Sequence, residues 1–187
     1  FEDINEADLR RVMEVNFFGM LAVTRYLLPI FRERRHGRIV IVSSESAFAG
    51  QPTNSIYCAS KWALEGWAES VAYELDPFGI EIVLIEPGPY KTAIWEASPR
   101  IRPKKSPYAP FVDKINQSVE EHVERTARDP EEVAEVILHV LETKKPKFRY
   151  PVGLSSKLGH FMRGKVPSVF IRHMIQRYLG VYGMRWR

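Results

Sequence analysis

Cysteine is almost absent from this sequence, with Cys58 the one cysteine among 187 residues. A single thiol cannot form a disulfide within the chain, so a disulfide-stabilised fold is excluded and a reducing compartment is expected. No continuous apolar run approaches the roughly 18 residues that a membrane-spanning helix needs, and the first residues do not have the charged-then-apolar order of a signal peptide. The five histidines are scattered without ligand spacing, so we expect no metal site.

Basic residues slightly outnumber acidic ones, 27 to 23, for a net charge of +4. They gather near residues 100–105, at 144–149 and after Lys165. Such groups can contact phosphates, acidic substrates or anionic lipid, or they can form an ordinary solvated face; both interpretations stay open. Aromatic and basic residues do not interleave, so a nucleic-acid partner is not expected.

The hydrophobic pattern predicts an α/β fold. The runs GRIVIVSS (37–44) and GIEIVLIEPG (79–88) are continuous and β-branched, which is typical of strands buried on both faces of a parallel sheet. Residues 59–75 between them have helical spacing, so strand, helix and strand form a right-handed βαβ unit.

Further elements are predicted on either side of this unit. A helix is expected from a cap at Asn5, with Asn16 in the middle of its apolar stripe, where an amide must find a hydrogen-bond partner. The other expected elements are a helix at 111–126, a helix that Asp129 begins, a strand at 148–152 and an amphipathic helix at 166–182. The expected apolar faces are Leu9, Val12, Met13, Met20, Val23, Thr24 and Leu27 in the first helix, and Val133, Val136, Ile137, Val140 and Leu141 in the helix after Asp129.

Ser44, Tyr57 and Lys61 have the spacing of a proton-transfer site. Tyr57 and Lys61 are four residues apart, so on a helix they lie one turn apart on the same face. An ammonium group near a phenol favours the phenolate and lowers the pKa of the tyrosine, which can then exchange a proton with a carbonyl or alcohol oxygen. A serine at the end of the preceding strand can hydrogen-bond the same oxygen.

Four stretches together resemble the short-chain dehydrogenase/reductase family: VNFFG (15–19), GRIVIVSS (37–44), YCASK (57–61) and PGPYKT (87–92). They stand in the order and at the spacing of that family, over about residues 1–150. The resemblance implies that Tyr57 is the catalytic acid and base and that Ser44 binds the substrate oxygen with it. It implies that Lys61 lowers the pKa of Tyr57 and holds the nicotinamide ribose, and that Asn16 anchors a water that relays protons to Lys61.

The same resemblance implies a cofactor, NAD or NADP. Its nicotinamide end would be contacted by the segment of Pro87, Gly88, Tyr90 and Thr92, through the backbone near Gly88 and Tyr90 and the hydroxyl of Thr92, together with Asn16, Tyr57 and Lys61. The implied fold is a Rossmann-like doubly wound parallel sheet, of which this chain has the C-terminal part. Residues 1–152 would form that part, with a substrate loop at about 88–128, and residues 153–187 an amphipathic helical tail.

The glycine-rich phosphate-binding turn that the family places after its first strand is not in this sequence. The chain also begins with Phe1 rather than methionine. We therefore expect a fragment or a processed chain, with an upstream segment of about 80 to 100 residues in the active protein, as half a dinucleotide fold requires. These 187 residues alone should bind a dinucleotide weakly or not at all, and should show an unpaired edge strand and a bare apolar helix face.

The function expected from these patterns is transfer of a hydride between a nicotinamide cofactor and an alcohol or carbonyl substrate. Ile94, Trp95, Tyr108 and Phe111 suggest an apolar lid over a steroid-, retinoid- or lipid-like substrate. The alternative is a non-catalytic binding or assembly module on the same scaffold. A homodimer or homotetramer in the cytoplasm is expected, with small residues Ala59, Ala63, Gly66 and Ser70 in its interface, and the basic tail could pack on its own domain or contact a membrane surface.

Overall fold

A parallel β-sheet with helices on both faces is the framework of the molecule. In the computed structural model, which describes residues 1–97 and 105–183, β1 (Gly37–Val42), β2 (Ile80–Pro87) and β3 (Arg149–Val152) lie in the order β1-β2-β3. Gly37 lies opposite Ile80 and Leu84 opposite Arg149, with all strands parallel. The predicted βαβ unit and the extra strand near residue 150 are confirmed.

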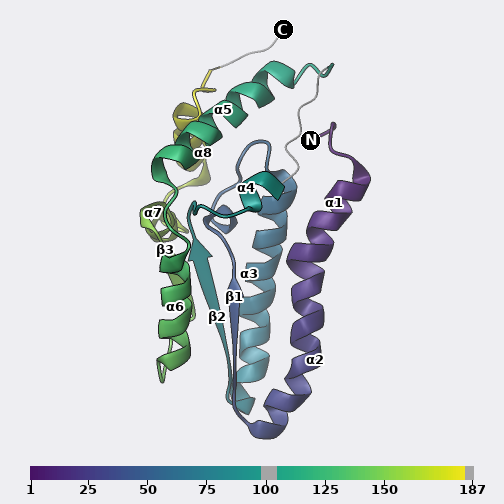
Figure 1. The fold of residues 1–187 in the computed structure, drawn as a ribbon, viewed down its shortest axis with the longest axis vertical. Helices are drawn as coiled ribbons and strands as arrows, with labels where there is room; N and C mark the ends of the chain where they lie inside the picture. Colours follow the sequence, from purple (N-terminus) through teal and green to yellow (C-terminus); the bar gives the residue numbers. More distant parts are fainter. Residues whose placement is uncertain (98–104, 184–187) are drawn as a thin grey trace.

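The helices pack on the two faces of this sheet and beyond its carboxyl end (Figure 1). α2 and α3 cover one face and α6 covers the other, while α5 crosses above the strands. Their bounds are α1 Glu6–Met13, a π-helical turn Glu14–Phe18, α2 Gly19–Arg34, α3 Ser55–Leu75, α4 Ile94–Ala97, α5 Ala109–Thr126, α6 Glu131–Glu142, α7 Leu154–Met162 and α8 Ser168–Tyr178, with short 3₁₀ turns η2 Glu45–Ala47 and η3 Asp76–Phe78.

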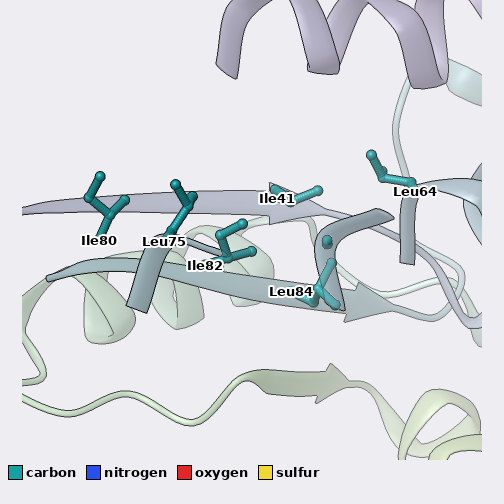
Figure 2. Close-up of a cluster of buried hydrophobic side chains, with 7 residues drawn as sticks. Ile41, Leu64, Leu75, Ile80, Ile82 and Leu84 are labelled. Carbon is teal, nitrogen blue, oxygen red and sulfur yellow. The ribbon is translucent and has the colours of Figure 1, made fainter. Parts of the chain in front are cut away.

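The face of the sheet toward α3 holds the larger part of the core. Figure 2 shows side chains of β1 and β2 close to those of α3, with Ile41, Leu64 and Leu84 at most 1% exposed. Alternate residues of β2 point to the two faces, so Ile82 and Leu84 meet α3 while Val83 and Ile85 meet α6. This burial on both faces is the physical reason for the continuous apolar runs in the sequence.

The helix after Asp129 is placed as expected, with one correction. The Asp129 carboxylate accepts a hydrogen bond from the Glu131 backbone N–H at 3.0 Å, which caps α6. Val133, Val136, Ile137 and Val140 pack on the sheet. Leu141 was expected on the same face and is instead 54% exposed, because it falls one position beyond the face that Val140 occupies.

The opening helix is interrupted where a single helix was predicted. Asn5 caps α1 by accepting from the Ala7 N–H at 2.7 Å, as expected. The π turn at Glu14–Phe18 then holds more residues per turn than an α-helix and rotates the face that meets the sheet. Phe17, Met20 and Leu28 therefore pack on the core, whereas Val23, predicted to lie inside, is 59% exposed.

The described residues contain both exposed features that the sequence predicted. β1 lies at one edge of the sheet, and β3 lies at the other. Large apolar side chains stand exposed along the opening helices, namely Val15, Phe18, Val23, Tyr26 and Ile30.

The tail forms two helices. The helix predicted at 166–182 is α8, which ends at Tyr178, and α7, for which no helix was predicted, precedes it and ends at Met162. Gly164, with φ +72°, lies between the two helices. In α8 and just after it, Ile175 and Leu179 pack against Ile115 of α5, which confirms in part that the tail packs on its own domain. Phe170 and Met174, expected on the same apolar face, are exposed. Most of the basic stretch at 100–105 lies outside the described residues.

Candidate active site

The candidate catalytic residues converge at the carboxyl end of the sheet. Ser44 follows β1 and begins the turn η2, while Tyr57 and Lys61 lie in the first two turns of α3. Trp62 of α3 donates its indole N–H to the backbone oxygen of Ser46 at 2.9 Å, which holds η2 against the helix. The carboxyl ends of parallel strands are where open α/β sheets bind their ligands.

Ser44 lies beside Tyr57, and hydrogen bonding by Ser44 lowers the pKa of the phenol. Ser44 is buried, and its Oγ also accepts from the Ser46 backbone N–H at 3.1 Å, so its orientation is defined. Burial raises the pKa of the Tyr57 phenol, the hydrogen bond with Ser44 lowers it, and the charges of Cys58 and Glu45 add to the rise. The phenol therefore favours its protonated form.

Lys61 lies beside Tyr57, and its role in lowering the pKa of the phenol stays a prediction. Its Nζ lies 5.8 Å from the centroid of the Tyr57 ring and donates to the backbone oxygen of Val42 at 3.0 Å. We expected Lys61 to lower the pKa of Tyr57. In the structure the pKa of Tyr57 is raised, because the effect of burial on the phenol is larger than the lowering effect of the hydrogen bond with Ser44. Burial also lowers the pKa of Lys61 itself.

Asn16 reaches the site through Ser60. It lies in the π turn of the opening helix, and its Nδ2 donates to the Ser60 Oγ at 3.1 Å, which in turn donates to the Tyr57 backbone oxygen at 2.7 Å. This contact satisfies the amide that the sequence placed on an apolar stripe. π turns are frequent at functional sites. The relay from Asn16 to Lys61 stays a prediction.

The Pro87–Thr92 segment lies at the end of β2, next to the Ser44 turn. The Gly88 N–H donates to the Val152 oxygen at 3.0 Å. A Cβ on Gly88 would lie 2.5 Å from the Ser155 Oγ and 3.2 Å from the Glu45 Oε2, so no larger residue fits without movement. The backbone of this turn thus approaches its neighbours as closely as a glycine allows.

The side chains of Tyr90 and Thr92 do not join the group around Tyr57. Tyr90 is 6% exposed, packs with the core beside α6 and donates its hydroxyl to Glu132 Oε2 at 2.7 Å. Burial and the Glu132 carboxylate raise the pKa of its phenol. Thr92 is exposed to solvent. A cofactor role for Tyr90 would therefore use its backbone, as predicted.

The four apolar residues predicted for a lid divide into two groups. Ile94 and Tyr108 are exposed, at 45% and 44%. Trp95 donates its indole N–H to the Tyr90 oxygen at 2.6 Å, and Phe111 packs with Ile115 of α5. The second pair is thus used in packing within the domain.

Glu45 is a residue of this site that the sequence analysis missed. It follows Ser44 directly, is half-buried, and its carboxylate hydrogen-bonds the side chain of Ser155 in α7. Burial raises the pKa of this carboxyl group, and the Ser155 hydrogen bond opposes the rise. An acid next to the candidate serine was the available signal, but its position beside the Gly88 turn depends on how η2 folds.

Neither a metal centre nor a membrane span is found in the part of the chain that the structure describes. Residues 1–97 and 105–183 bring no three His, Cys, Asp or Glu side chains together as metal ligands. None of the helices in these ranges is long and apolar enough to cross a bilayer. A hollow of about 330 Å³, lined by Arg25, Leu28, Arg32 and Leu75 among others, lies at the opposite end of the strands, away from Tyr57.

This chain is similar in sequence to a family of short-chain dehydrogenases and to two curated oxidoreductases. A family model described as short chain dehydrogenase matches residues 1–102. The uncharacterized oxidoreductase YusZ of Bacillus subtilis is 41% identical over 172 residues, covering 89% of this chain and 61% of that protein. Human 17-beta-hydroxysteroid dehydrogenase type 1 is 38% identical over 171 residues, covering 80% of this chain and 47% of that protein.

A solved structure supports the same relationship. A short-chain dehydrogenase from Streptomyces avermitilis superposes with a TM-score of 0.73 at 29% identity, covering 99% of this chain and 66% of that one. The chain spans about half to three fifths of the length of the two curated relatives. The matched model covers more than half of the 187 residues and includes Asn16, Ser44, Tyr57 and Lys61. The chain belongs to the short-chain dehydrogenase/reductase family.

Proposed function

We propose that this chain carries the proton-transfer site of a nicotinamide-dependent oxidoreductase that interconverts an alcohol and a carbonyl compound. The observation that carries the proposal is the convergence of Ser44 after β1 with Tyr57 and Lys61 of α3, where the Lys61 Nζ lies 5.8 Å from the centroid of the Tyr57 ring. Two hydroxyl groups beside each other at the carboxyl end of β1 can both reach one substrate oxygen.

The roles of the residues follow from their chemistry. Tyr57 donates its proton to a carbonyl oxygen, or accepts one from an alcohol, and Ser44 hydrogen-bonds the same oxygen and stabilises developing charge. Because burial raises the pKa of Tyr57, the phenol is protonated at neutral pH, which suits the proton donor. Asn16 supports the site through Ser60, and a proton relay from Asn16 to Lys61 completes it.

The residues present fit the nicotinamide end of a dinucleotide. Lys61 offers ammonium donors for the ribose beside Tyr57, and the Pro87–Thr92 backbone approaches the same side of the sheet, with the exposed Thr92 hydroxyl available as a donor. NAD or NADP, when bound, supplies or accepts the hydride.

The proposed substrate is a neutral, steroid-, retinoid- or lipid-like alcohol or ketone. The exposed Ile94 and Tyr108 flank the segment that follows the Pro87–Gly88 turn and offer apolar surface. The name of the human relative, a hydroxysteroid dehydrogenase, supports this class.

The decisive experiment compares the full protein with its Tyr57→Phe and Ser44→Ala variants. Loss of general acid catalysis lowers kcat by roughly 10² to 10⁴-fold, so Tyr57→Phe should lose nearly all turnover of a ketone while still binding the dinucleotide. The alternative, a non-catalytic binding or assembly module, predicts no turnover in the wild type either. Turnover that survives Tyr57→Phe contradicts the assignment of Tyr57 as the proton donor.

We also propose that the protein forms a homodimer or homotetramer through α2 and α3. The exposed apolar residues of α2, such as Val23 and Tyr26, and the open space over Gly66 in α3 support this surface. A Gly66→Arg variant should shift the molecular mass measured by light scattering toward the monomer; an unchanged mass contradicts this interface.

We also propose that the protein lies in the cytoplasm and that its tail contacts anionic lipid at a membrane surface. The tail, residues 153–187, holds 7 Lys and Arg residues and no Asp or Glu. Leu154, Leu158 and Phe161 are exposed along one side of α7, so apolar and basic groups occur together, as membrane-surface binding requires. Flotation with vesicles that contain or lack phosphatidylserine tests this: binding that is independent of anionic lipid, or absent, contradicts it, and Leu158→Ser should weaken it.

A further inference from the structure

Helix α7 packs against both turns of the candidate site. The Ser156 hydroxyl donates to the Glu86 backbone oxygen at the end of β2. A Cβ on Gly159 would lie 2.9 Å from the ring of Phe48, which follows η2, so the helix approaches the Ser44 turn as closely as a glycine allows. The helix therefore contacts the turn after β1 and the end of β2 at the same time.

His160 of α7 lies between these two parts of the site. Its Nδ1 lies 3.1 Å from the Oε2 of Glu86, the last residue but one of β2. The centroid of its ring lies 5.8 Å from that of Phe48, in an edge-to-face arrangement. The ring is partly exposed, whereas its Nδ1 atom and the Glu86 carboxylate are buried. One imidazole thus connects the end of β2 with the Ser44 turn.

The contact between His160 and Glu86 requires a proton. The Nδ1 and Oε2 atoms lie within hydrogen-bond distance, and neither has a hydrogen-bond partner elsewhere in residues 1–97 and 105–183. A carboxylate oxygen and an unprotonated imidazole nitrogen both present lone pairs, so they would repel each other if no proton lay between them. The other carboxylate oxygen, Oε1, accepts from Arg149 at 2.8 Å, which leaves Oε2 to face His160.

We propose that Glu86 and His160 are positioning residues for the Pro87–Gly88 turn: a proton held between the Glu86 Oε2 and the His160 Nδ1 fixes the end of β2 against α7. This inference rests on the proposed function, which assigns that turn to the nicotinamide end of the cofactor. Gly88 comes two residues after Glu86, and its N–H donates to the Val152 oxygen at 3.0 Å. A displaced Glu86 would therefore loosen the backbone that is to hold the cofactor.

The charged groups around this pair come from β3, from α3 and from the chain after α7. They are Arg149, Glu65, Glu69, Arg163 and Lys165. Both arginines contact the buried carboxylate of Glu65, so part of their charge is already compensated before it reaches Glu86 and His160.

The donor of the shared proton changes near neutral pH. Burial raises the pKa of the Glu86 carboxyl group to about 7, against the opposing charge of Arg163. Burial lowers the pKa of His160, and the three cations add to this effect. Below about pH 7 the protonated carboxyl group therefore donates to a neutral imidazole. At higher pH the carboxylate accepts from the Nδ1–H of a neutral imidazole, so the imidazole changes its tautomer.

The first test follows the ring nitrogens of His160 by ¹⁵N NMR, in the full protein labelled at histidine and free of dinucleotide. His160→Asn assigns the resonances. An ordinary histidine gains a proton as the pH falls, whereas the Nδ1 of His160 should change from acceptor to donor as the pH rises through about 7. In Glu86→Gln, Arg149 holds the amide oxygen and the NH₂ group faces His160, so Nδ1 should stay an acceptor. An Nδ1 that loses its proton as the pH rises overturns the inference.

The second test follows the Gly88 amide, whose hydrogen exchange reports how firmly the turn is held. Proline ¹³C and glycine ¹⁵N labels identify it, because Pro87–Gly88 is the one Pro–Gly pair among the 187 residues. His160→Phe keeps a ring beside Phe48 and removes both nitrogens. Exchange at Gly88 should then become about 2- to 10-fold faster, as loss of one hydrogen bond predicts. His160→Asn keeps a polar group near the position of Nδ1 and should restore part of the protection.

His139→Phe is the matched control, because His139 of α6 is also partnered by an aromatic ring, that of Tyr150 at 6.4 Å, and is exposed. It should leave exchange at Gly88 unchanged. Equal exchange in the wild type and His160→Phe contradicts the positioning role, as does equally fast exchange in His160→Phe and His160→Asn. The titration still decides the matter if His160→Phe does not fold. Both measurements use the protein without dinucleotide or turnover, so they can fail while the proposed function holds, and the reverse.

Discussion

The guanidinium of Arg149 in β3 donates to the carboxylate of Glu86 in β2 at 2.8 Å, and Glu86 is completely buried. The same guanidinium contacts the buried Glu65 of α3 and lies 3.1 Å from Glu69. Arg163 of α7 adds a contact to Glu65 at 3.3 Å. One cationic side chain thus connects β3, β2 and α3 just below the active site.

Replacing Arg149 by methionine should destabilise the protein strongly. Removing one partner of a buried ion pair leaves charge without compensation and costs about 3 to 5 kcal/mol. Urea unfolding of Arg149→Met against the wild type measures this loss. Arg10→Ala, which breaks an exposed ion pair with Glu6 in α1, is the control and should cost less than about 1 kcal/mol. Similar losses in the two variants would contradict the structural importance of Arg149.

Stability should depend on pH through Glu86. Burial raises the pKa of this carboxyl group to about 7, against the opposing charge of Arg163. The folded state then binds the proton more tightly than the unfolded state, so the contribution of Glu86 is complete below its ordinary pKa of 4.5 and is lost as pH rises toward about 7. Glu86→Gln should remove this dependence, so the difference in unfolding free energy between wild type and variant should change between pH 4.5 and 7.

His160, which lies 3.1 Å from Glu86, acts in the opposite direction. Burial lowers its pKa, so its contribution is present above about pH 6.5 and is lost as the pH falls. A His160→Gln variant separates the two groups. The effect of Glu86→Gln on the unfolding free energy is measured both with His160 and with His160→Gln. If this effect does not change with pH in either case, Glu86 does not titrate in this range.

Gly88→Ala should impair the site because of steric overlap. The added methyl group would lie 2.5 Å from the Ser155 Oγ, and overpacking of this kind costs about 1 to 3 kcal/mol. The double variant Gly88→Ala/Ser155→Ala removes the nearest atom, so part of the lost stability and activity should return. Thermal unfolding and turnover measure both. Strictly additive losses would mean that the methyl group and Ser155 do not meet.

The variants Asn16→Ala and Ser60→Ala distinguish two roles of Asn16. In one role it only supports α3 through Ser60, and in the other it also takes part in a proton relay to Lys61. Each variant removes the hydrogen bond of 3.1 Å between the two side chains, at a cost of about 1 kcal/mol in unfolding free energy. If Asn16 also serves the proposed relay to Lys61, turnover should fall further in Asn16→Ala than in Ser60→Ala. Equal turnover in two equally stable variants would contradict the relay.

Local patterns were sufficient to predict most elements and the position of the main site residues. The β-branched runs of β1 and β2 and the helical spacing of α3 reflect burial on both sides of a sheet, which is a local requirement. Ser44, Tyr57 and Lys61 could be grouped as candidates because they lie at a strand end and within the first turns of one helix. Helix α7 was not predicted, because its apolar residues Leu154, Leu158 and Phe161 are exposed and its packing on the domain depends on contacts such as Ser156 with Glu86.

What the amino-acid sequence determined by itself was the βαβ order and the set of polar groups at the carboxyl end of the strands, since periodicity and turn chemistry act over a few residues. Only the tertiary structure decided which charges these groups meet. Folding brings Ser155 of α7 and Glu45 to the same Gly88 turn although they are more than 100 residues apart. Burial of the Tyr57 phenol raises its pKa where a nearby lysine alone would lower it. Desolvation and charge depend on neighbours that only folding brings together.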